Sequence, residues 1–259
     1  MSTSMLRGRA PLFVGAVTLA VAIASLGHQV NAQAPAGRGA APALSPWGGA
    51  PIDLTGYWVS VVNEDWRWRM VTPPKGDYAS VPMTDEARKV ADTWDVSKDG
   101  QCEAYGAAGL MRMPTRLHIT WDGDNVLKID TDAGQQTRRL QFDASAQAAG
   151  RSLQGHSIAE WERPAGAGRG QVGPGGNLKV TTNNLRAGWL RKNGVPYSQN
   201  AVVNEFIDRF AAPNGDQWLV VTTIVEDPMY LNQPFVTSTH FKKEPDGSKW
   251  APAACKPTT

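Results

Sequence analysis

The chain has 259 residues and a formal net charge of +2, and its 26 Lys and Arg residues are scattered among 24 acidic ones. Scattered charge offers no basic stripe for a phosphate backbone, which argues against nucleic acid or another strongly acidic partner. The length suffices for one large β domain or two small ones.

The first 32 residues have the three parts of a secretory signal peptide. Two arginines precede an apolar run from Ala10 to Leu26, and small residues at 30–32 form a cleavage site of the A-x-A kind. The run is marginal against the ~20 apolar residues that a membrane span needs, and no other segment comes near that length. We therefore expect a mature chain that starts near Gln33, has no membrane span and is periplasmic or secreted.

Residues 33–51 are rich in Ala, Gly and Pro, which predicts a disordered leader before a domain at 52–259. From Trp58 to Met70, aromatic and apolar residues fall mainly on even positions and charged residues on odd ones. This period of two predicts a strand with an aromatic face and a charged face. One short helix is expected from Thr84, its N-cap, to about Trp94.

Eight later segments carry strand signals, and turn formers separate several of them. They are residues 116–121, 126–131, 137–142, 155–162, 177–183, 202–210, 218–226 and 235–243. Residues 163–176 are rich in Gly and Pro and lack apolar periodicity, so they are expected to form a mobile loop. Many strands without βαβ alternation favour a sandwich or a barrel. We predict an all-β fold with a single antiparallel β-barrel of about eight to ten strands, because closure removes exposed edges and leaves room for one small ligand.

The two cysteines, Cys102 and Cys255, most simply form one disulfide in an oxidising compartment. The alternative is two free thiols or a redox pair. The absence of a C-x-x-C motif and the Pro-rich surroundings of Cys255 argue against that alternative.

Five motifs resemble, in order, those of a large family of secreted bacterial proteins whose members mostly have no assigned activity. The motifs are D-L-[ST]-G-x-W at 53–58, G-H-S-x-x-x-W-E at 155–162, G-x-P-[HY]-S at 194–198, E-D-P-x-Y-x-x-x-P-[WF] at 226–235 and W-x-x-x-x-C at 250–255. The resemblance implies secretion and a single β-rich domain, and it implies no reaction. The chain departs from the family at the 163–176 insert. Its Gly56-x-Trp58 opening is also similar to the first strand of lipocalins.

Two groups of residues are candidates for acid–base catalysis. His156 and Glu160 lie on one face of a predicted strand, where a carboxylate would raise the pKa of the imidazole. The structural alternative is a polar pair on an outer face. Asp227 and Tyr230 follow a long apolar strand, where they would act as an acid or hydrogen-bond donor at the barrel mouth, or else simply form a turn.

The segment Asp65–Arg69 has the most unusual composition in the chain. If Arg67 and Arg69 face inward they would grip a carboxylate, whereas inward-facing Trp66 and Trp68 would suit a flat apolar ligand. We also predict that Tyr197 contacts the ligand, together with these four residues. The alternative is an ordinary aromatic core, although ten tryptophans favour an aromatic-lined cavity.

Three histidines, His118, His156 and His240, fall in predicted strands and would form a zinc site if they converged inside a barrel. Their spacing offers no ligand pair, so we predict no metal and no cofactor.

The leading functional hypothesis is capture of a small apolar or aromatic molecule inside the barrel. The alternative is a cofactor-independent acid–base enzyme (lyase, hydratase, isomerase or hydrolase) that uses the same cavity. A third reading is an interaction module that makes contact through residues 163–176. The contents of the barrel interior would separate these hypotheses, and the oligomeric state is left open.

Overall fold

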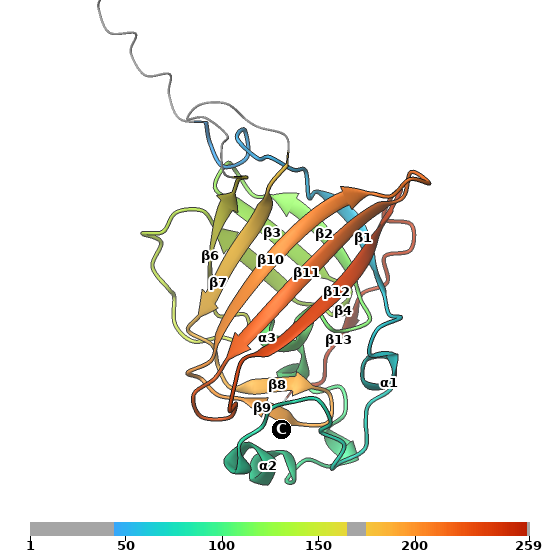
Figure 1. Ribbon diagram of the computed structural model, residues 1–259, viewed down its shortest axis with the longest axis vertical. Coiled ribbons are helices and arrows are strands. Elements are labelled where there is room, and N and C mark those ends of the chain that lie inside the picture. The colour runs from blue at the N-terminus through green and yellow to red at the C-terminus, as the bar shows by residue number, and fades with distance from the viewer. Residues whose placement is uncertain (1–43, 165–174, 258–259) are drawn as a thin grey trace, which may run out of the picture. The chain divides into compact units, whose positions relative to one another are not determined.

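The computed structural model describes residues 44–164 and 175–257. The expected signal peptide, the leader before residue 44 and the centre of the 163–176 loop therefore lie outside the described residues. A closed β-barrel of nine strands dominates the fold, in the order β1-β12-β11-β10-β7-β6-β5-β3-β2 (Figure 1). In chain order the barrel strands are β1 (Gly56–Val61), β2 (Arg116–Trp121), β3 (Val126–Thr131), β5 (Thr137–Gln141), β6 (His156–Glu162), β7 (Asn177–Asn183), β10 (Val202–Ala211), β11 (Gln217–Glu226) and β12 (Phe235–Glu244).

All eight strands predicted after residue 115 are confirmed, as is the single barrel. The prediction of a purely antiparallel barrel is wrong at one place, because β5 and β6 pair in parallel through Leu140↔Ser157. The connection between them spans residues 142–155, which meets the length of about a dozen residues that a parallel crossover needs. Every other neighbouring pair in the barrel is antiparallel.

Alternating apolar residues on these strands point inward and pack into one core. On β2 and β3, for example, Leu117, Ile119, Leu127 and Ile129 are all buried while their chain neighbours on the opposite face are more exposed. The buried barrel core consists of Leu54, Trp58, Met111, Leu117, Ile119, Leu127, Ile129, Leu140, Ala159, Leu178, Val180, Ile207, Leu219, Val221 and Phe241.

Residues 44–54 lie across one end of the barrel. The Trp161 indole N–H donates to the carbonyl of Pro46 at 2.9 Å, and the Trp47 amide donates to the carbonyl of Asp124 at 3.2 Å. Leu54 is buried in the barrel core. The ordered domain therefore begins before residue 52, because residues assigned by composition to a disordered leader pack on the barrel instead.

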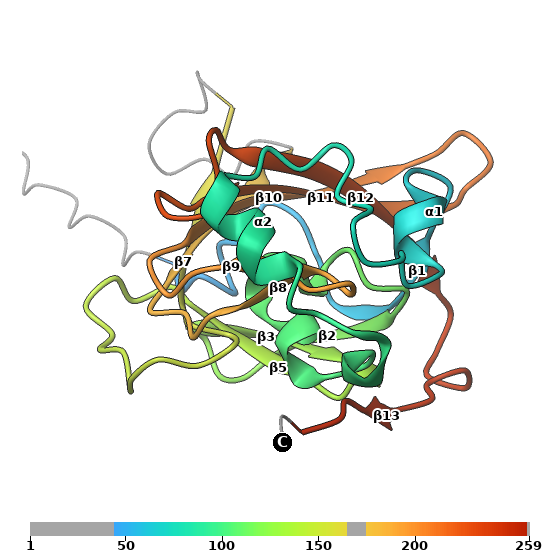
Figure 2. The same cartoon turned by 90° about the horizontal axis from the view of Figure 1, so that it is seen from below.

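The opposite end of the barrel is covered by a layer that we call the base, which is built from two insertions (Figure 2). Residues 62–115, between β1 and β2, form α1 (Trp66–Arg69), α2 (Asp85–Ala91), the short 3-10 turns η1 (Val96–Lys98) and η2 (Cys102–Tyr105), and α3 (Ala107–Leu110). Residues 184–201, between β7 and β10, form the hairpin of β8 (Gly188–Arg191) and β9 (Val195–Tyr197). Figure 2 shows α2, β8 and β9 lying across the barrel end. The base has an apolar core of its own, which β10, β11 and β12 complete from the barrel side.

The predicted helix is confirmed as α2, and the Thr84 side chain accepts a hydrogen bond from the Ala87 amide as its N-cap. The predicted strand from Trp58 to Met70 is wrong beyond Val61. Asp65 takes a left-handed backbone conformation with φ of 54°, and one turn of helix follows it. Contacts with other parts of the base hold this turn, so tertiary packing overrides an alternating pattern that is otherwise typical of a strand. The short helices α1 and α3 were not predicted.

The predicted disulfide is confirmed: Cys102 in η2 is bonded to Cys255 in the C-terminal tail, 153 residues away. Next to it, β13 (Ala253–Ala254) pairs in parallel with β4 (Ala133–Gly134). The disulfide and the β4–β13 pairing together hold the C-terminal tail against the outside of the fold.

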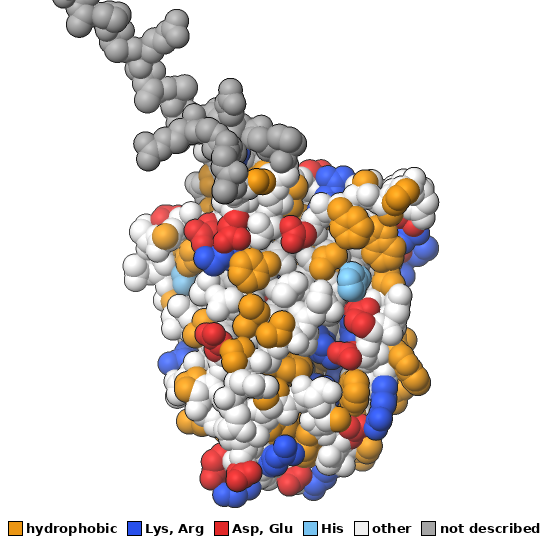
Figure 3. Space-filling view, in the orientation of Figure 1, with side chains coloured by type: hydrophobic (Ala, Val, Ile, Leu, Met, Phe, Trp, Pro, Cys, Tyr) orange, Lys and Arg blue, Asp and Glu red, His pale blue; other side chains and the backbone are white. Residues whose placement is uncertain are grey.

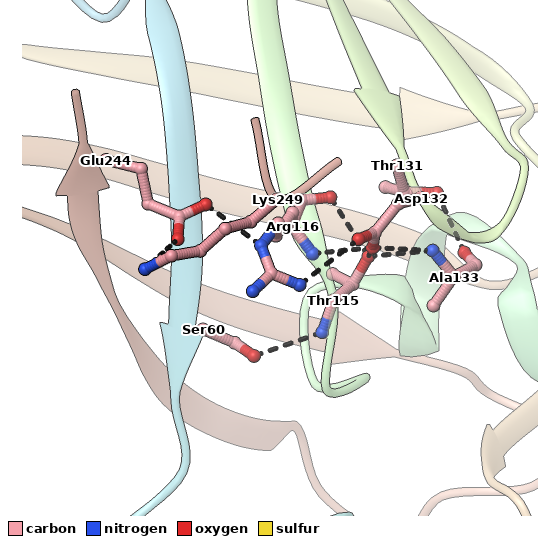
Figure 4. A network of polar contacts seen from close by, with 8 residues as sticks. All are labelled: Ser60, Thr115, Arg116, Thr131, Asp132, Ala133, Glu244 and Lys249. Carbon is pink, nitrogen blue, oxygen red and sulfur yellow. Dashed lines mark hydrogen bonds and ion pairs between the residues drawn. The ribbon is translucent and has the colours of Figure 1, made fainter. Parts of the chain in front are cut away.

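A polar network beside this tail joins β1, β2, β3, β4 and β12 (Figure 4). The Asp132 carboxylate accepts hydrogen bonds from the backbone amides of Arg116 and Ala133, each at 2.7 Å, and from the Thr115 hydroxyl at 2.9 Å. The Arg116 guanidinium in turn donates to Glu244 at the end of β12, at 2.9 Å. Asp132 and Glu244 are buried, so the network satisfies charges that would otherwise be costly to bury. Among the described residues, no helix is long and apolar enough to cross a membrane.

Candidate functional site

The barrel interior is occupied by its own side chains, including a closed ion pair. Arg138 on β5 and Glu205 on β10 are both fully buried, and Arg138 Nη1 donates to Glu205 Oε1 at 2.8 Å while Nη2 donates to Oε2. Arg138 Nη2 also donates to the Thr182 hydroxyl, which shares a hydrogen bond of 2.7 Å with Ser157. This interior is a packed core in which the two charges neutralise each other, and Arg138 Nε is the one nitrogen of that guanidinium without a hydrogen-bond partner among the described residues. Candidate ligand sites therefore lie outside the barrel.

His156 and Glu160 do lie on one face of β6, as their parity predicts, and it is the outer face. Four residues along a strand span about 13 Å, too far for the two side chains to share a proton. Glu160 instead forms a cross-strand ion pair with Lys179 on β7, at 2.7 Å. Glu160 therefore belongs to a polar pair on the outer face of the barrel, as the structural alternative proposed, but its partner is Lys179 and not His156.

Asp227 is buried at the end of β11, and its carboxylate is used by the backbone around it. It accepts the Ser198 amide, the Ser198 hydroxyl at 2.8 Å and the Met229 amide at 3.0 Å. Tyr230 packs against the base core, and its carbonyl accepts the Thr84 amide at the start of α2. The cluster fastens the β11–β12 connection to the base, and this is the turn role that the sequence offered as the alternative.

The three histidines stay apart on the barrel. His118 on β2 stacks on Tyr57 with ring centroids 4.1 Å apart, and His240 on β12 lies 3.5 Å from the Glu64 carboxylate. His156 lies on β6, which belongs to a different part of the barrel circumference. Within the described ranges, no group of three or more His, Cys, Asp and Glu side chains has the geometry to hold a metal ion.

The four residues of α1 separate into an exposed pair and an inner pair. Trp66 is exposed, and Arg67 reaches outward to Asp77, with 2.8 Å between Nη2 and the carboxylate. Trp68 donates its indole N–H to the same carboxylate at 3.2 Å, and Arg69 is buried. Trp68 and Arg69 therefore lie together in the base, while neither reaches the barrel interior.

Tyr197, also predicted to bind ligand, is fully buried in the base core. Its ring fits between the backbones of Gly106 and Gly188, where a Cβ atom on either glycine would collide with the phenol oxygen. Burial raises the pKa of this phenol far above its usual value. The structure thus places Tyr197 where it supports the base, away from any surface that a ligand would reach first.

The base carries an apolar groove of about 610 Å³ between two loops. One wall is the loop that follows α1, and the other runs from Trp94 through η1 to Asp99. Val71 on the first wall is 63% exposed, and Val96 on the second is 78% exposed. Trp94 is buried behind them, with Gly194 of the β8–β9 turn packed against its side chain. The groove is lined by Val71, Thr72, Pro73, Pro74, Lys75, Trp94, Asp95, Val96 and Asp99.

Sequence reasoning missed this groove because its walls are loops and one short 3-10 turn, η1, with no helix or strand among them. Pro73-Pro74 prevents both helix and strand, so no periodicity marks Val71 or Val96 as buried or exposed. The signal that was available is the presence of large apolar residues in segments that predict loops. Such residues have to be covered by the protein itself or by something that binds to it.

In comparisons with known proteins, no family model, no curated protein and no solved structure matches the chain.

Proposed function

We propose that the protein is a β-barrel binding protein that captures a small apolar or aromatic molecule in the groove of its base. The observation that carries the proposal is the groove itself, an open recess of about 610 Å³ with exposed valines on both walls. Ligand sites for small molecules have volumes of about 300–1,000 Å³ and walls that are mostly apolar. The packed barrel serves as a rigid scaffold for this site rather than as its container.

The polar groups of the groove are few and are already fixed in place. The Thr72 hydroxyl donates to the Asp99 carboxylate at 2.8 Å and so connects the two walls. Hydrogen bonds from the Ser97 amide and hydroxyl lower the pKa of Asp95, which keeps this carboxylate ionised at neutral pH. The two carboxylates at the rim, Asp95 and Asp99, outnumber the one lysine of the lining, Lys75, so we propose a neutral or cationic ligand.

The place of action that we propose is outside the cytoplasm. The disulfide between Cys102 and Cys255 suits an oxidising compartment. The signal-peptide pattern of residues 1–32 and the resemblance to secreted bacterial proteins support the same location.

Binding of the neutral fluorescent probe N-phenyl-1-naphthylamine to the oxidised protein tests the proposal. We expect saturable binding that weakens at least tenfold in Val96→Asp, because the substitution removes an apolar contact and places a charge on the wall. A tenfold loss corresponds to about 1.4 kcal/mol, close to the value of burying one valine side chain.

Val236→Asp is the matched control, since Val236 is 57% exposed on the outer face of β12 and does not line the groove. We expect its affinity for the probe to equal that of the wild type. Equal losses in both variants, or no saturable binding at all, would overturn the proposal. Far-ultraviolet circular dichroism of each variant shows that the barrel has formed.

A further inference from the structure

Three arginines of the base bury their side chains around one small cavity, and we call them the arginine cluster. Arg69 comes from α1, Arg112 from the segment after α3 and Arg191 from the end of β8, and their exposed fractions are 2%, 6% and 5%. The cavity has a volume of about 10 Å³. In Figure 3, Lys and Arg atoms lie recessed beside acidic groups in the region between β12 and α1. The cavity is lined by Trp68, Arg69, Ala104, Gly109, Arg112, Met113, Leu190, Arg191 and Lys192.

Two of the three guanidinium groups have a carboxylate partner. Arg69 pairs with Glu64, and Arg112 pairs with Asp65 at 3.0 Å. Arg191 has no salt-bridge partner in the described part of the chain. The nearby Asp77 is already held by Arg67 and Trp68. The cluster therefore buries one more positive charge than its paired carboxylates neutralise.

The unpaired charge comes with unpaired donors. Arg191 Nε, Arg191 Nη1 and Arg69 Nη2 are buried, and none has a hydrogen-bond partner among the described residues. Buried N–H groups are nearly always satisfied in folded proteins, and an unsatisfied charged donor costs the most. Two guanidinium groups thus present unused donors at the same cavity.

The fold holds Arg191 in this position. Its guanidinium lies over the Trp68 ring, 4.9 Å from the centroid, and Trp68 is in turn fixed by its hydrogen bond to Asp77. Burial, and secondarily the charge of Arg112, lower the pKa of Arg191 to about 10. The side chain still carries its proton at neutral pH, so the cavity stays cationic.

We propose that the cavity binds one small monovalent anion, a halide or the carboxylate group of a small organic acid, between Arg69 and Arg191. An acceptor there satisfies the unused donors and balances the extra charge. The volume admits about one atom, so a halide ion or a single carboxylate oxygen of a small acid would enter, while the bulk of sulfate, phosphate or a larger acid would not. The site is independent of the apolar groove, because the groove is flanked by carboxylates and takes a neutral or cationic molecule.

Thermal unfolding of the oxidised protein in chloride, formate or gluconate at matched ionic strength tests the site. We expect the Tm to rise in a saturable way with chloride or formate, and to stay unchanged with gluconate, which is too large to enter. Tighter binding of formate would assign the site to carboxylates, and tighter binding of chloride would assign it to halides. A response that is the same for all three anions would overturn the proposal.

Arg191→Met removes the unpaired charge and keeps an unbranched apolar stem, and we expect it to abolish the anion-dependent rise in Tm. Arg139→Met on β5 is the control, since Arg139 is a half-exposed arginine paired with Asp122 on the barrel and should leave the rise intact. An undiminished rise in Arg191→Met would overturn the site. If that variant does not fold, bromide in crystals of the wild type decides, because the proposal requires an anomalous peak within hydrogen-bond reach of Arg191 and its absence would refute it.

Discussion

The barrel and the base both bury arginines, but the buried arginines of the two regions differ in whether a carboxylate neutralises each of them. Inside the barrel, Arg138 meets Glu205 in a two-pronged ion pair in which both partners are fully buried. In the base, Arg191 is nearly as buried, yet it has no carboxylate partner among the described residues, and two of its nitrogens lack a hydrogen-bond partner where Arg138 has one such nitrogen. The buried charges of the barrel are paired with each other, whereas the base holds a buried arginine without a counter-charge among the described residues.

The inward apolar side chains of the barrel and those of the groove walls also differ in how far they are covered. Strand pairing fixes the neighbours of each inward residue in the barrel, so Leu117, Val221 and Phe241 are all buried together. The base is assembled from long insertions, and its walls leave Val71 and Val96 exposed. The difference teaches that strand pairing specifies the packing of the barrel, whereas the irregular base leaves apolar side chains uncovered, and this is why we propose the ligand site there.

The largest expected effect is on the closed ion pair of the barrel. Glu205→Gln leaves the Arg138 charge buried without its counter-charge, and we expect the free energy of unfolding to fall by about 3–5 kcal/mol. Urea denaturation measures this loss. The double change Arg138→Met with Glu205→Leu should recover most of it, because no charge is then buried.

Glu64→Gln in the base is the comparison, since Glu64 is one-third exposed and water can replace it beside Arg69. We expect a clearly smaller loss than in Glu205→Gln. If Glu64→Gln and Glu205→Gln lowered the free energy of unfolding equally, the ion pairs of the base and of the barrel would not differ in how much they contribute to stability.

The second effect concerns the disulfide, which fastens the tail to the base. Replacing Cys102 and Cys255 together with serine should lower the free energy of unfolding by about 2–5 kcal/mol. Hydrogen exchange should show the gain in exchange around η2, β13 and β4, with the central amides of β10 and β11 still protected as the slowest to exchange. A uniform loss of protection across the barrel would contradict the expectation that the disulfide stabilises the base and the tail more than the barrel.

The third effect is at the N-cap of α2. Thr84→Ala removes the acceptor for the Ala87 amide and also the hydrogen bond to the Met229 carbonyl, and we expect a loss of about 1 kcal/mol. Thr93→Ala is the matched control, because its hydroxyl only bonds the Val90 carbonyl at the exposed end of the same helix. Chemical denaturation should show a loss of a few tenths of a kcal/mol at most for this control.

The smallest effect is a dependence on pH at the base. The Trp68 indole N–H, assisted by Arg67, lowers the pKa of Asp77 below its usual value of 3.8. A carboxyl whose pKa is lower in the folded state contributes its stability fully above pH 4, and loses it as the pH falls through the folded pKa. In Trp68→Phe the pKa of Asp77 should rise toward its usual value, as measured by the carboxyl carbon shift in an NMR titration. An unchanged pKa would show that the hydrogen bond does not hold Asp77.

How much the sequence predicts differs between the same two regions. Period-two alternation and turn formers predict β2, β3 and the later barrel strands, because each strand carries its own inward and outward faces. The N-cap at Thr84 and the disulfide also follow from local signals. The parallel pair of β5 and β6 does not, since orientation depends on the path of residues 142–155 through space.

The base resists such reasoning because its contacts join residues far apart in the chain. Arg69, Arg112 and Arg191 meet in the fold, and nothing in the sequence near any of them marks the other two. The segment at 65–69 drew attention by its composition, and it does supply Trp68 and Arg69 to the arginine cluster. Its strand assignment failed because the helical turn after Asp65 depends on packing within the base.

An NMR titration of the labelled, oxidised protein with N-phenyl-1-naphthylamine tests the central claim that ligands bind at the base and not inside the barrel. The account predicts saturable shifts at the amides of Val71 and Val96 and at the Trp94 indole, which Trp94→Phe identifies. The inward residues Ile119 and Val221 should not shift. The largest shifts at those barrel positions, with the groove unchanged, would contradict it.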